Sequence, residues 1–185
     1  FEDRIVHRAL YDIIGPIFEK RFIHDSYACQ RGKGTHTGIA RLRQFLWQYP
    51  MPPYYLQIDI KSYFASIDHT TLLEIIQKKI ADRDVLALIQ RILDSYHDSP
   101  GIGIPLGNLT SQLFANIYLN ELDYHVKHTL KCRHYLRYMD DIILLSETKA
   151  QLWEWKTAIE EYLARLRLRI HPRKQVIAPA RCGID

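Results

Sequence analysis

Two adjacent carboxylates, Asp140 and Asp141, stand at the entrance of an apolar run in "RYMDDIILLS" (137–146). Such a run is typical of a buried strand, where an isolated ionised carboxylate is very costly unless it is paired or binds a metal. Asp59 interrupts another apolar run, "YYLQIDI" (54–60), in the same way. These acids therefore require cations, and the kind of cation decides the chemistry.

An all-oxygen set of ligands, with no His or Cys among them, suits a hard cation such as Mg²⁺. Two such ions, typically about 3.5–4 Å apart, activate an attacking oxygen and stabilise a leaving one in a phosphoryl displacement. The acids thus predict a site for two Mg²⁺ ions, with Mn²⁺ as the alternative ion. A second interpretation stays open at this point, in which Arg133 or Arg137 neutralises each acid in a structural ion pair.

The elements that must position these acids alternate between strands and helices. Hydrophobic periodicity predicts strands over 54–60, 133–139, 142–146 and 174–178, with a tight turn at the acidic pair. It predicts helices over 3–20, 37–48, 69–80, 83–97, 109–129 and 148–166, with Asp68 and Asp82 as N-caps of the third and fourth. From residue 54 onward this is the split βαβ, ferredoxin-like order of an α+β fold. In that plan the first strand lies beside the hairpin, so we expect Asp59 next to the turn.

Bulk composition narrows the class of protein. The 185 residues are 47% apolar and 25% charged, which excludes a disordered, collagen-like or coiled-coil chain. No apolar run is long enough for a membrane span, and the three cysteines lack any C-x-x-C spacing, which suits a reducing cytoplasm. The net charge of +4 comes with basic clusters at 31–43, 127–137 and 165–174, which indicate either a nucleic-acid partner or solvated helix faces. The run "YPMPP" (49–53) is the best candidate boundary and divides the chain into 1–49 and 50–185.

Five ordered blocks of sequence resemble the reverse transcriptases. They are "YMDD" (138–141), "DIKSYF" (59–64), the loop and helix "GIPLGNLTSQLFANIYLNELD" (103–123), the fingers-like loop "SYACQRGKGTH" (26–36) and the lysine-bearing "HPRKQ" (171–175). The resemblance implies the right-hand polymerase fold, with fingers over 1–49 and a palm over 50–185. It also implies that the chain stops before the primer grip and the thumb, so that this fragment alone is weak or inactive.

Within that family, "LGNLTSQ" (106–112) is most like the enzymes of diversity-generating retroelements. Group II intron and retron enzymes usually have Gln in place of Leu106 and Pro in place of Gln112. The resemblance implies error-prone copying of an RNA template, with a DNA or RNA primer, dNTPs, a small basic accessory protein and a bacterial or phage source. The alternatives are a group II intron-like, retron or abortive-infection reverse transcriptase, a DNA-templated or template-independent polymerase, or a non-catalytic RNA-binding module that retains the fold.

The resemblance also implies roles for single residues around the acids. Asp59 and Asp140 are expected as the main metal ligands, with the backbone carbonyl of Ile60 in one ion's shell and Asp141 as a third carboxylate. Phe64 is expected to block a ribose 2′-OH, with core packing as the alternative.

Further roles fall on the loops. Arg31 and Lys33 are expected to clamp the triphosphate, and Leu106, Gly107 and Asn108 to lie against the templating pair. Gln112 is expected either to contact the template or to cap its helix locally. Leu106 removes a polar contact to the incoming nucleotide, which predicts looser selection. Lys174 is expected either to protonate the leaving pyrophosphate as a general acid or to be a solvated charge.

Overall fold

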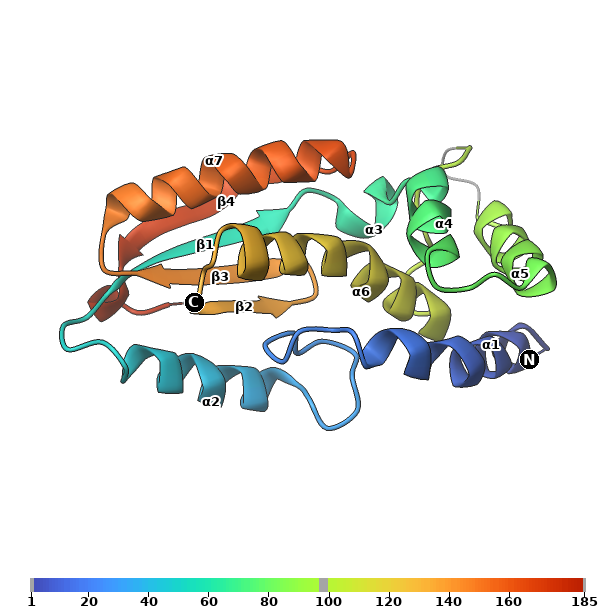
Figure 1. Cartoon of the computed structure of the whole chain (residues 1–185), viewed down its shortest axis with the longest axis horizontal. Helices are drawn as coiled ribbons and strands as arrows, with labels where there is room; N and C mark the ends of the chain where they lie inside the picture. Colours follow the sequence, from blue (N-terminus) through green and yellow to red (C-terminus); the bar gives the residue numbers. More distant parts are fainter. Residues whose placement is uncertain (1, 97–99, 185) are drawn as a thin grey trace. The chain divides into compact units, whose positions relative to one another are not determined.

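The computed structural model describes residues 2–96 and 100–184, which form two compact units. One unit comprises Phe1–Phe22 and Ser62–Glu121, and the other comprises Ile23–Lys61 and Leu122–Asp185. Figure 1 shows the elements of each unit. The division into a fingers segment and a palm at residues 49 and 50 is a functional one and stays a prediction.

The second unit contains a four-stranded antiparallel sheet with the order β2-β3-β1-β4. This order is the split βαβ arrangement, so the predicted α+β, ferredoxin-like palm fold is confirmed. Because β1 pairs with β3 on one side and β4 on the other, it lies inside the sheet, which explains its apolar sequence. The strands are β1 (Tyr54–Ile60), β2 (Tyr135–Tyr138), β3 (Asp141–Ser146) and β4 (Ile170–Pro179).

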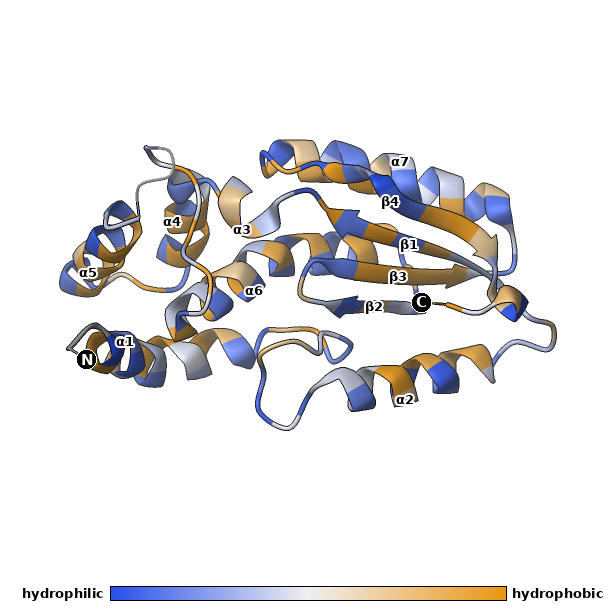
Figure 2. Cartoon of the chain, turned by 180° about the vertical axis from the view of Figure 1, so that it is seen from behind, coloured by the Kyte–Doolittle hydropathy of each residue, from blue (hydrophilic) through white to orange (hydrophobic). Residues whose placement is uncertain are grey.

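The alternation of side chains along β1 supplies two packing faces. Leu56, Ile58 and Ile60 are almost fully buried, and helix α7 (Lys149–Arg165) packs along the sheet. On the alternate face Tyr55 joins a buried cluster with Leu136, Leu145, Tyr27 and Phe45, the last from helix α2 (Thr35–Leu46). Figure 2 shows the apolar middle of β1 and β3 and the hydrophilic residues at their ends beside the β2–β3 turn.

The first unit is helical, and the starts of α4 (His69–Gln77) and α5 (Arg83–Asp94) follow from local capping. The Asp68 carboxylate accepts a hydrogen bond of 2.8 Å from the Thr71 amide, and Asp82 accepts bonds of 2.9 and 3.0 Å from the amides of residues 84 and 85, so both predicted N-caps are confirmed. The helices are α1 (Glu2–Glu19), α3 (Tyr63–Ser66), α4 (His69–Gln77), α5 (Arg83–Asp94) and α6 (Leu109–Tyr124), whose last residues belong to the second unit.

The predicted elements differ from the observed ones mainly at their ends. α5 ends at Asp94, and position 97, where we expected its end, lies outside the described residues. α6 continues into a π-helical turn, His125–Thr129, which completes the helix expected over 109–129. Within the described part of the chain, none of the helices combines the length and apolar character that crossing a membrane requires.

Candidate active site

The acidic pair lies at a two-residue hairpin turn. Met139 and Asp140 form the turn, and Tyr138 pairs with Asp141 as the last rung of the β2–β3 ladder. Asp141 is therefore the first residue of β3, which corrects the prediction that both acids lie in the turn. Met139 has φ +55°, in the left-handed region that residues other than Gly seldom adopt. The turn gives the two acids different backbone positions, Asp140 at the tip and Asp141 in the strand.

Asp59 lies directly opposite Asp141 in the β1–β3 register. Side chains on such a rung point to the same face of the sheet and are typically about 4.5–5.5 Å apart at Cβ. The pairing of β1 with β3 therefore brings together acids that are about eighty residues apart in the sequence. The juxtaposition that the strand order predicts is present.

Burial and neighbouring carboxylates raise the pKa values of Asp140 and Asp141. Burial raises the pKa of Asp140 above its ordinary range, and the charges of Asp141 and Asp59 raise it further, although Lys174 opposes the shift. The pKa of Asp141 is likewise raised, first by burial and then by Asp59. Like charges that raise one another's pKa indicate a site where a further cation would be stabilising.

Lys174 of β4 forms an ion pair with one of these acids, Asp59. Its ammonium donates a hydrogen bond of 3.1 Å to Oδ2 of Asp59, and its side chain is 64% exposed. This bond and the charge of Asp59 raise the pKa of Lys174, so the lysine is fully protonated at neutral pH. Beside it the β1–β4 register shifts between Ile58 and Ile60, an irregularity of the kind often found next to active sites. Ile60 itself is 1% exposed and pairs with Ile170.

The donor set fits a divalent cation in its chemistry. All three side chains offer carboxylate oxygens, the ligands that Mg²⁺ prefers, and two of them have raised pKa values that a cation would relieve. Among residues 2–96 and 100–184, however, no three His, Cys, Asp or Glu side chains are already gathered as a finished metal site. One carboxylate oxygen of Asp59 forms an ion pair with Lys174 instead of contributing to such a finished site.

A sequence model described as "Reverse transcriptase (RNA-dependent DNA polymerase)" matches residues 1–182, almost the whole chain. The chain belongs to the reverse transcriptase family. The five sequence blocks that indicated this family all lie within the matched range.

Curated relatives of this reverse transcriptase chain include two bacterial proteins. Protein YkfC of Escherichia coli (strain K12) is 27% identical over 170 residues, which cover 85% of this chain and 45% of YkfC. The group II intron-encoded protein LtrA of Lactococcus lactis subsp. cremoris is 32% identical over 130 residues, which cover 66% of this chain and 21% of LtrA. The chain thus spans less than half the length of these relatives.

Solved structures of yeast telomerases share the fold. Apo telomerase from Candida tropicalis, truncated from its C-terminal domain, matches with a TM-score of 0.71 and 15% identity, over 97% of this chain and 41% of that one. The telomerase of the same species in complex with the TWJ fragment of telomeric RNA matches with a TM-score of 0.67 and 16% identity, over 96% of this chain and 34% of that one. At this identity the likeness shows the fold alone, and it agrees with a fingers and palm architecture.

The fingers-like loop of this reverse transcriptase chain uses Lys33 internally. The ammonium donates hydrogen bonds of 2.8 Å to the carbonyl of His24 and 3.0 Å to that of Ser26, and burial lowers the pKa of this lysine. Arg31, by contrast, is exposed. Both residues line a pocket of about 520 Å³ next to the start of α2. The structure thus gives Lys33 a loop-holding role that the sequence did not reveal, and leaves Arg31 facing solvent.

The other residues expected at the site belong to the first unit. Phe64 in α3 is half-buried, with its ring 5.6 Å from that of Tyr63 in an edge-on contact. Tyr63 is 2% exposed and donates a hydrogen bond of 2.5 Å to the carbonyl of Ala115, so it is a packing residue. Leu106 is 76% exposed and forms a turn with Gly107, whose φ of +91° favours glycine. Gln112 is half-buried in the first turns of α6.

Sequence reasoning missed a buried polar cluster next to the hairpin. Arg137 and Asp123 are both 0% exposed and form an ion pair of 2.7 Å, and Tyr135 donates a hydrogen bond of 2.6 Å to Asp123. Arg137 therefore pairs with Asp123, which overturns the interpretation that it neutralises the acidic pair. The signal in the sequence was an Arg inside an apolar strand, because a fully buried Arg requires a buried acid.

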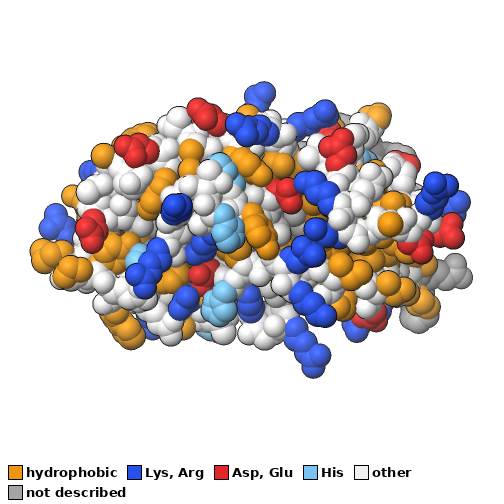
Figure 3. Space-filling model, in the orientation of Figure 1, with side chains coloured by type: hydrophobic (Ala, Val, Ile, Leu, Met, Phe, Trp, Pro, Cys, Tyr) orange, Lys and Arg blue, Asp and Glu red, His pale blue; other side chains and the backbone are white. Residues whose placement is uncertain are grey.

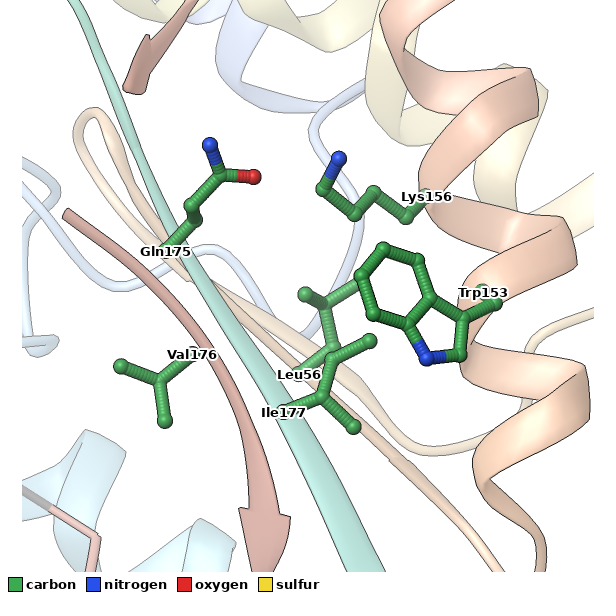
Figure 4. Close-up of a pocket in the computed structure, with 6 residues that line it drawn as sticks. All are labelled: Leu56, Trp153, Lys156, Gln175, Val176 and Ile177. Carbon is green, nitrogen blue, oxygen red and sulfur yellow. The ribbon is translucent and has the colours of Figure 1, made fainter. Parts of the chain in front are cut away.

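Two further views show the surface charge and a pocket beside the sheet. Figure 3 shows Lys and Arg side chains at many points of one face, interspersed with hydrophobic ones. Figure 4 shows a pocket of about 270 Å³ between α7 and the sheet, where Trp153 and Lys156 face Leu56 and Ile177. None of the residues predicted for catalysis or nucleotide binding lines this pocket, so it is separate from the candidate active site.

Proposed function

We propose that this chain is the catalytic part of an enzyme that synthesises DNA on an RNA template by two-metal-ion nucleotidyl transfer. One observation carries the proposal: Asp59 lies opposite Asp141, beside the turn that bears Asp140, in a chain of the reverse transcriptase family. A decayed site would have little reason to retain acids that repel one another. The proposed enzyme is an RNA-directed DNA polymerase of the bacterial cytoplasm.

The residues that would hold two Mg²⁺ ions are Asp59, Asp140, Asp141 and the carbonyl of Ile60. When bound, such ions activate the attacking 3′-oxygen and neutralise the charge that develops on the leaving oxygen. Lys174 lies beside Asp59 and is protonated at neutral pH, so it holds a proton where a leaving pyrophosphate would need one. Its proposed role is that of general acid.

Nucleotide and template contacts are proposed for the remaining residues. Arg31 would bind the triphosphate, and Lys33 would support it by holding the loop in shape. Phe64 would exclude a ribose 2′-OH, and Leu106 and Gly107 would lie against the templating pair. Gln112 would contact the template. The proposed partners are an RNA template, a DNA or RNA primer and dNTPs.

The type of reverse transcriptase has two candidates, each favoured by one observation. The "LGNLTSQ" form of the loop favours the diversity-generating type, with error-prone synthesis and a small basic accessory protein. The match to the group II intron-encoded protein favours the intron type. Misincorporation concentrated at template adenines, measured by sequencing of the products, favours the first type. Accurate copying of adenines favours the second.

Primer extension tests the proposed activity. The full-length protein is assayed with Mg²⁺ on matched RNA and DNA templates, beside Asp140→Ala and the control Asp12→Ala, which removes an exposed carboxylate of α1. We expect Asp140→Ala to lower the rate at least about 1,000-fold, because several kcal/mol of transition-state stabilisation is lost. Asp12→Ala should match the wild type.

Each outcome bears on a different part of the proposal. Wild-type activity in Asp140→Ala would overturn the mechanism, and a strong preference for DNA templates would overturn only the RNA-templated part. RNA binding without synthesis by the wild type would favour the non-catalytic RNA-binding module. Since the chain spans less than half of its relatives, we propose that it extends primers weakly or not at all when alone.

A further inference from the structure

Arg137 contacts the catalytic hairpin through its side chain. Its Nε and Nη2 donate hydrogen bonds of 2.8 and 2.7 Å to the two carboxylate oxygens of Asp123. Its Nη1 donates a third bond of 3.0 Å to the carbonyl of Met139. The acceptor thus belongs to the turn residue that directly precedes Asp140.

The turn needs such support because Met139 holds a left-handed backbone angle. A residue with a Cβ is disfavoured there, and such conformations persist only where the surroundings hold them in place. A charged donor 3.0 Å from the Met139 carbonyl fixes the peptide group that links this residue to Asp140. The position of Asp140 therefore depends on the position of the Arg137 guanidinium.

Asp123 in turn fixes the guanidinium. The two oxygens of the carboxylate bind the planar fork in the bidentate geometry that Arg alone among the cationic side chains provides. Tyr135 donates a further bond of 2.6 Å to Asp123. Burial of two charges carries a desolvation cost that only good geometry and extra hydrogen bonds offset, so this pair is weak evidence of a gain in stability and stronger evidence of a fixed geometry.

The backbone of Arg137 forms hydrogen bonds with the fingers-like loop. The Arg137 amide donates a hydrogen bond of 2.9 Å to the carbonyl of Asp25, and the Tyr27 amide donates one of 2.9 Å to the Arg137 carbonyl. Ser26, between them, accepts the bond from Lys33. Arg137 thus joins the catalytic turn to the loop that is proposed to bind the triphosphate.

We infer that Arg137, clamped by Asp123 and Tyr135, is a positioning residue that fixes the turn bearing Asp140 and thereby sets the affinity of the site for divalent cations. This inference rests on the proposed function, because it assigns a purpose to the geometry of Asp140. Arg137 is fully buried, and its guanidinium donates to Asp123 and Met139. Its effect passes through the carbonyl of Met139.

The test measures metal binding apart from catalysis. Mn²⁺ alone is titrated into the full-length protein, and free Mn²⁺ is followed by electron paramagnetic resonance. Arg137→Lys keeps the charge, but its three donors all lie on one nitrogen and cannot reproduce the planar fork that reaches both oxygens of Asp123 and the carbonyl of Met139. We therefore expect Mn²⁺ binding to weaken at least tenfold. In the same variant the amides of Asp140 and Asp141 should exchange with solvent at least tenfold faster, whereas those of α7 keep the wild-type rate.

Two further variants keep the result decisive. Tyr135→Phe removes one hydrogen bond to Asp123, so it should fold and weaken Mn²⁺ binding by about two- to threefold. If Arg137→Lys does not fold, the Mn²⁺ binding of Tyr135→Phe alone tests the positioning role. Ile159→Val shortens a fully buried side chain of α7 and is the control for a general loss of stability. Its Mn²⁺ binding should equal that of the wild type.

The outcomes separate this inference from the proposed function. The positioning role is overturned if folded Arg137→Lys shows wild-type Mn²⁺ affinity and wild-type amide exchange. If Arg137→Lys does not fold, the same result in Tyr135→Phe overturns it. Equal weakening in Ile159→Val also overturns it, because the effect would then reflect stability in general. Wild-type Mn²⁺ binding that persists in Asp59→Asn overturns the proposed metal site instead.

Discussion

Asp59 and Asp141 occupy the same rung of the β1–β3 ladder, so two like charges face each other inside one sheet. Like charges directly opposite each other destabilise a sheet. The pKa of Asp141 is raised although the neighbouring Lys174 opposes the shift, so the fold carries this rung at a cost, as functional sites often do. The cost can be measured.

Removal of one of these charges should stabilise the metal-free protein. We expect Asp141→Asn to raise the free energy of unfolding by about 0.2–1 kcal/mol at pH 7, the range for such cross-strand pairs, while it reduces DNA synthesis. Urea denaturation in the presence of a chelator measures the first effect, and primer extension measures the second. A loss of stability in Asp141→Asn would contradict the prediction, and the control Asp12→Asn should change neither quantity.

The same variant should show a defined dependence on pH. Burial and the charge of Asp59 raise the pKa of Asp141 in the folded state above its unfolded value of about 3.9. The folded state then binds more protons, so the destabilisation is complete above the folded pKa and is relieved as the pH falls towards about 4. The stability difference between Asp141→Asn and the wild type should therefore shrink between pH 7 and about pH 4. A difference independent of pH would contradict this assignment.

Lys174 should compete with metal ions for Asp59. We expect Lys174→Gln to tighten Mn²⁺ binding to the nucleotide-free protein by about two- to fivefold, since one nearby surface cation is removed. Lys174→Arg keeps the charge and should leave Mn²⁺ binding unchanged, but it cannot act as an acid at neutral pH. Both variants should slow nucleotide incorporation if Lys174 protonates pyrophosphate. Full incorporation by Lys174→Arg would reduce the lysine to an electrostatic role.

Local patterns accounted for much of the fold. The strand at 54–60, the two Asp N-caps and the adjacency of β1 and β3 follow from periodicity, capping chemistry and the order of the elements. The confirmed family follows from motifs that lie in sequence order. Such features depend on neighbours in the chain or on a small set of topologies, so a sequence can predict them.

The partners of single side chains were less predictable. Arg137 is three residues from Asp140 in the sequence, yet its guanidinium binds Asp123 of α6 and the carbonyl of Met139. Lys33 was expected to clamp a phosphate, yet its ammonium binds loop carbonyls. Long cationic side chains reach many groups, and only the packed structure decides which group they meet.

Lys33 and Arg31 should therefore respond differently to the same substitution. Lys33→Met removes a charged donor from two loop carbonyls, so we expect a loss of about 1–2 kcal/mol in the free energy of unfolding. Arg31→Met changes an exposed residue of the same pocket and should stay within about 0.5 kcal/mol of the wild type. In steady-state primer extension, Arg31→Met should raise the KM for dNTPs. Unchanged stability in Lys33→Met would show that its loop contacts contribute nothing.

Leu106 should influence the accuracy of synthesis without affecting stability. It is 76% exposed in a turn, so Leu106→Gln should keep the free energy of unfolding within about 0.5 kcal/mol of the wild type. Under the role proposed for Leu106, a Gln at this position would supply a hydrogen-bonding group to the incoming nucleotide. We therefore expect several-fold less misincorporation on an RNA template, because a correctly paired nucleotide would gain a contact that a mispaired one lacks. Leu106→Met is the matched control, since it retains an apolar side chain of similar size and should copy with wild-type errors. Sequencing of extension products measures the error frequency, and an equal frequency in all three proteins would remove Leu106 from the determinants of selection.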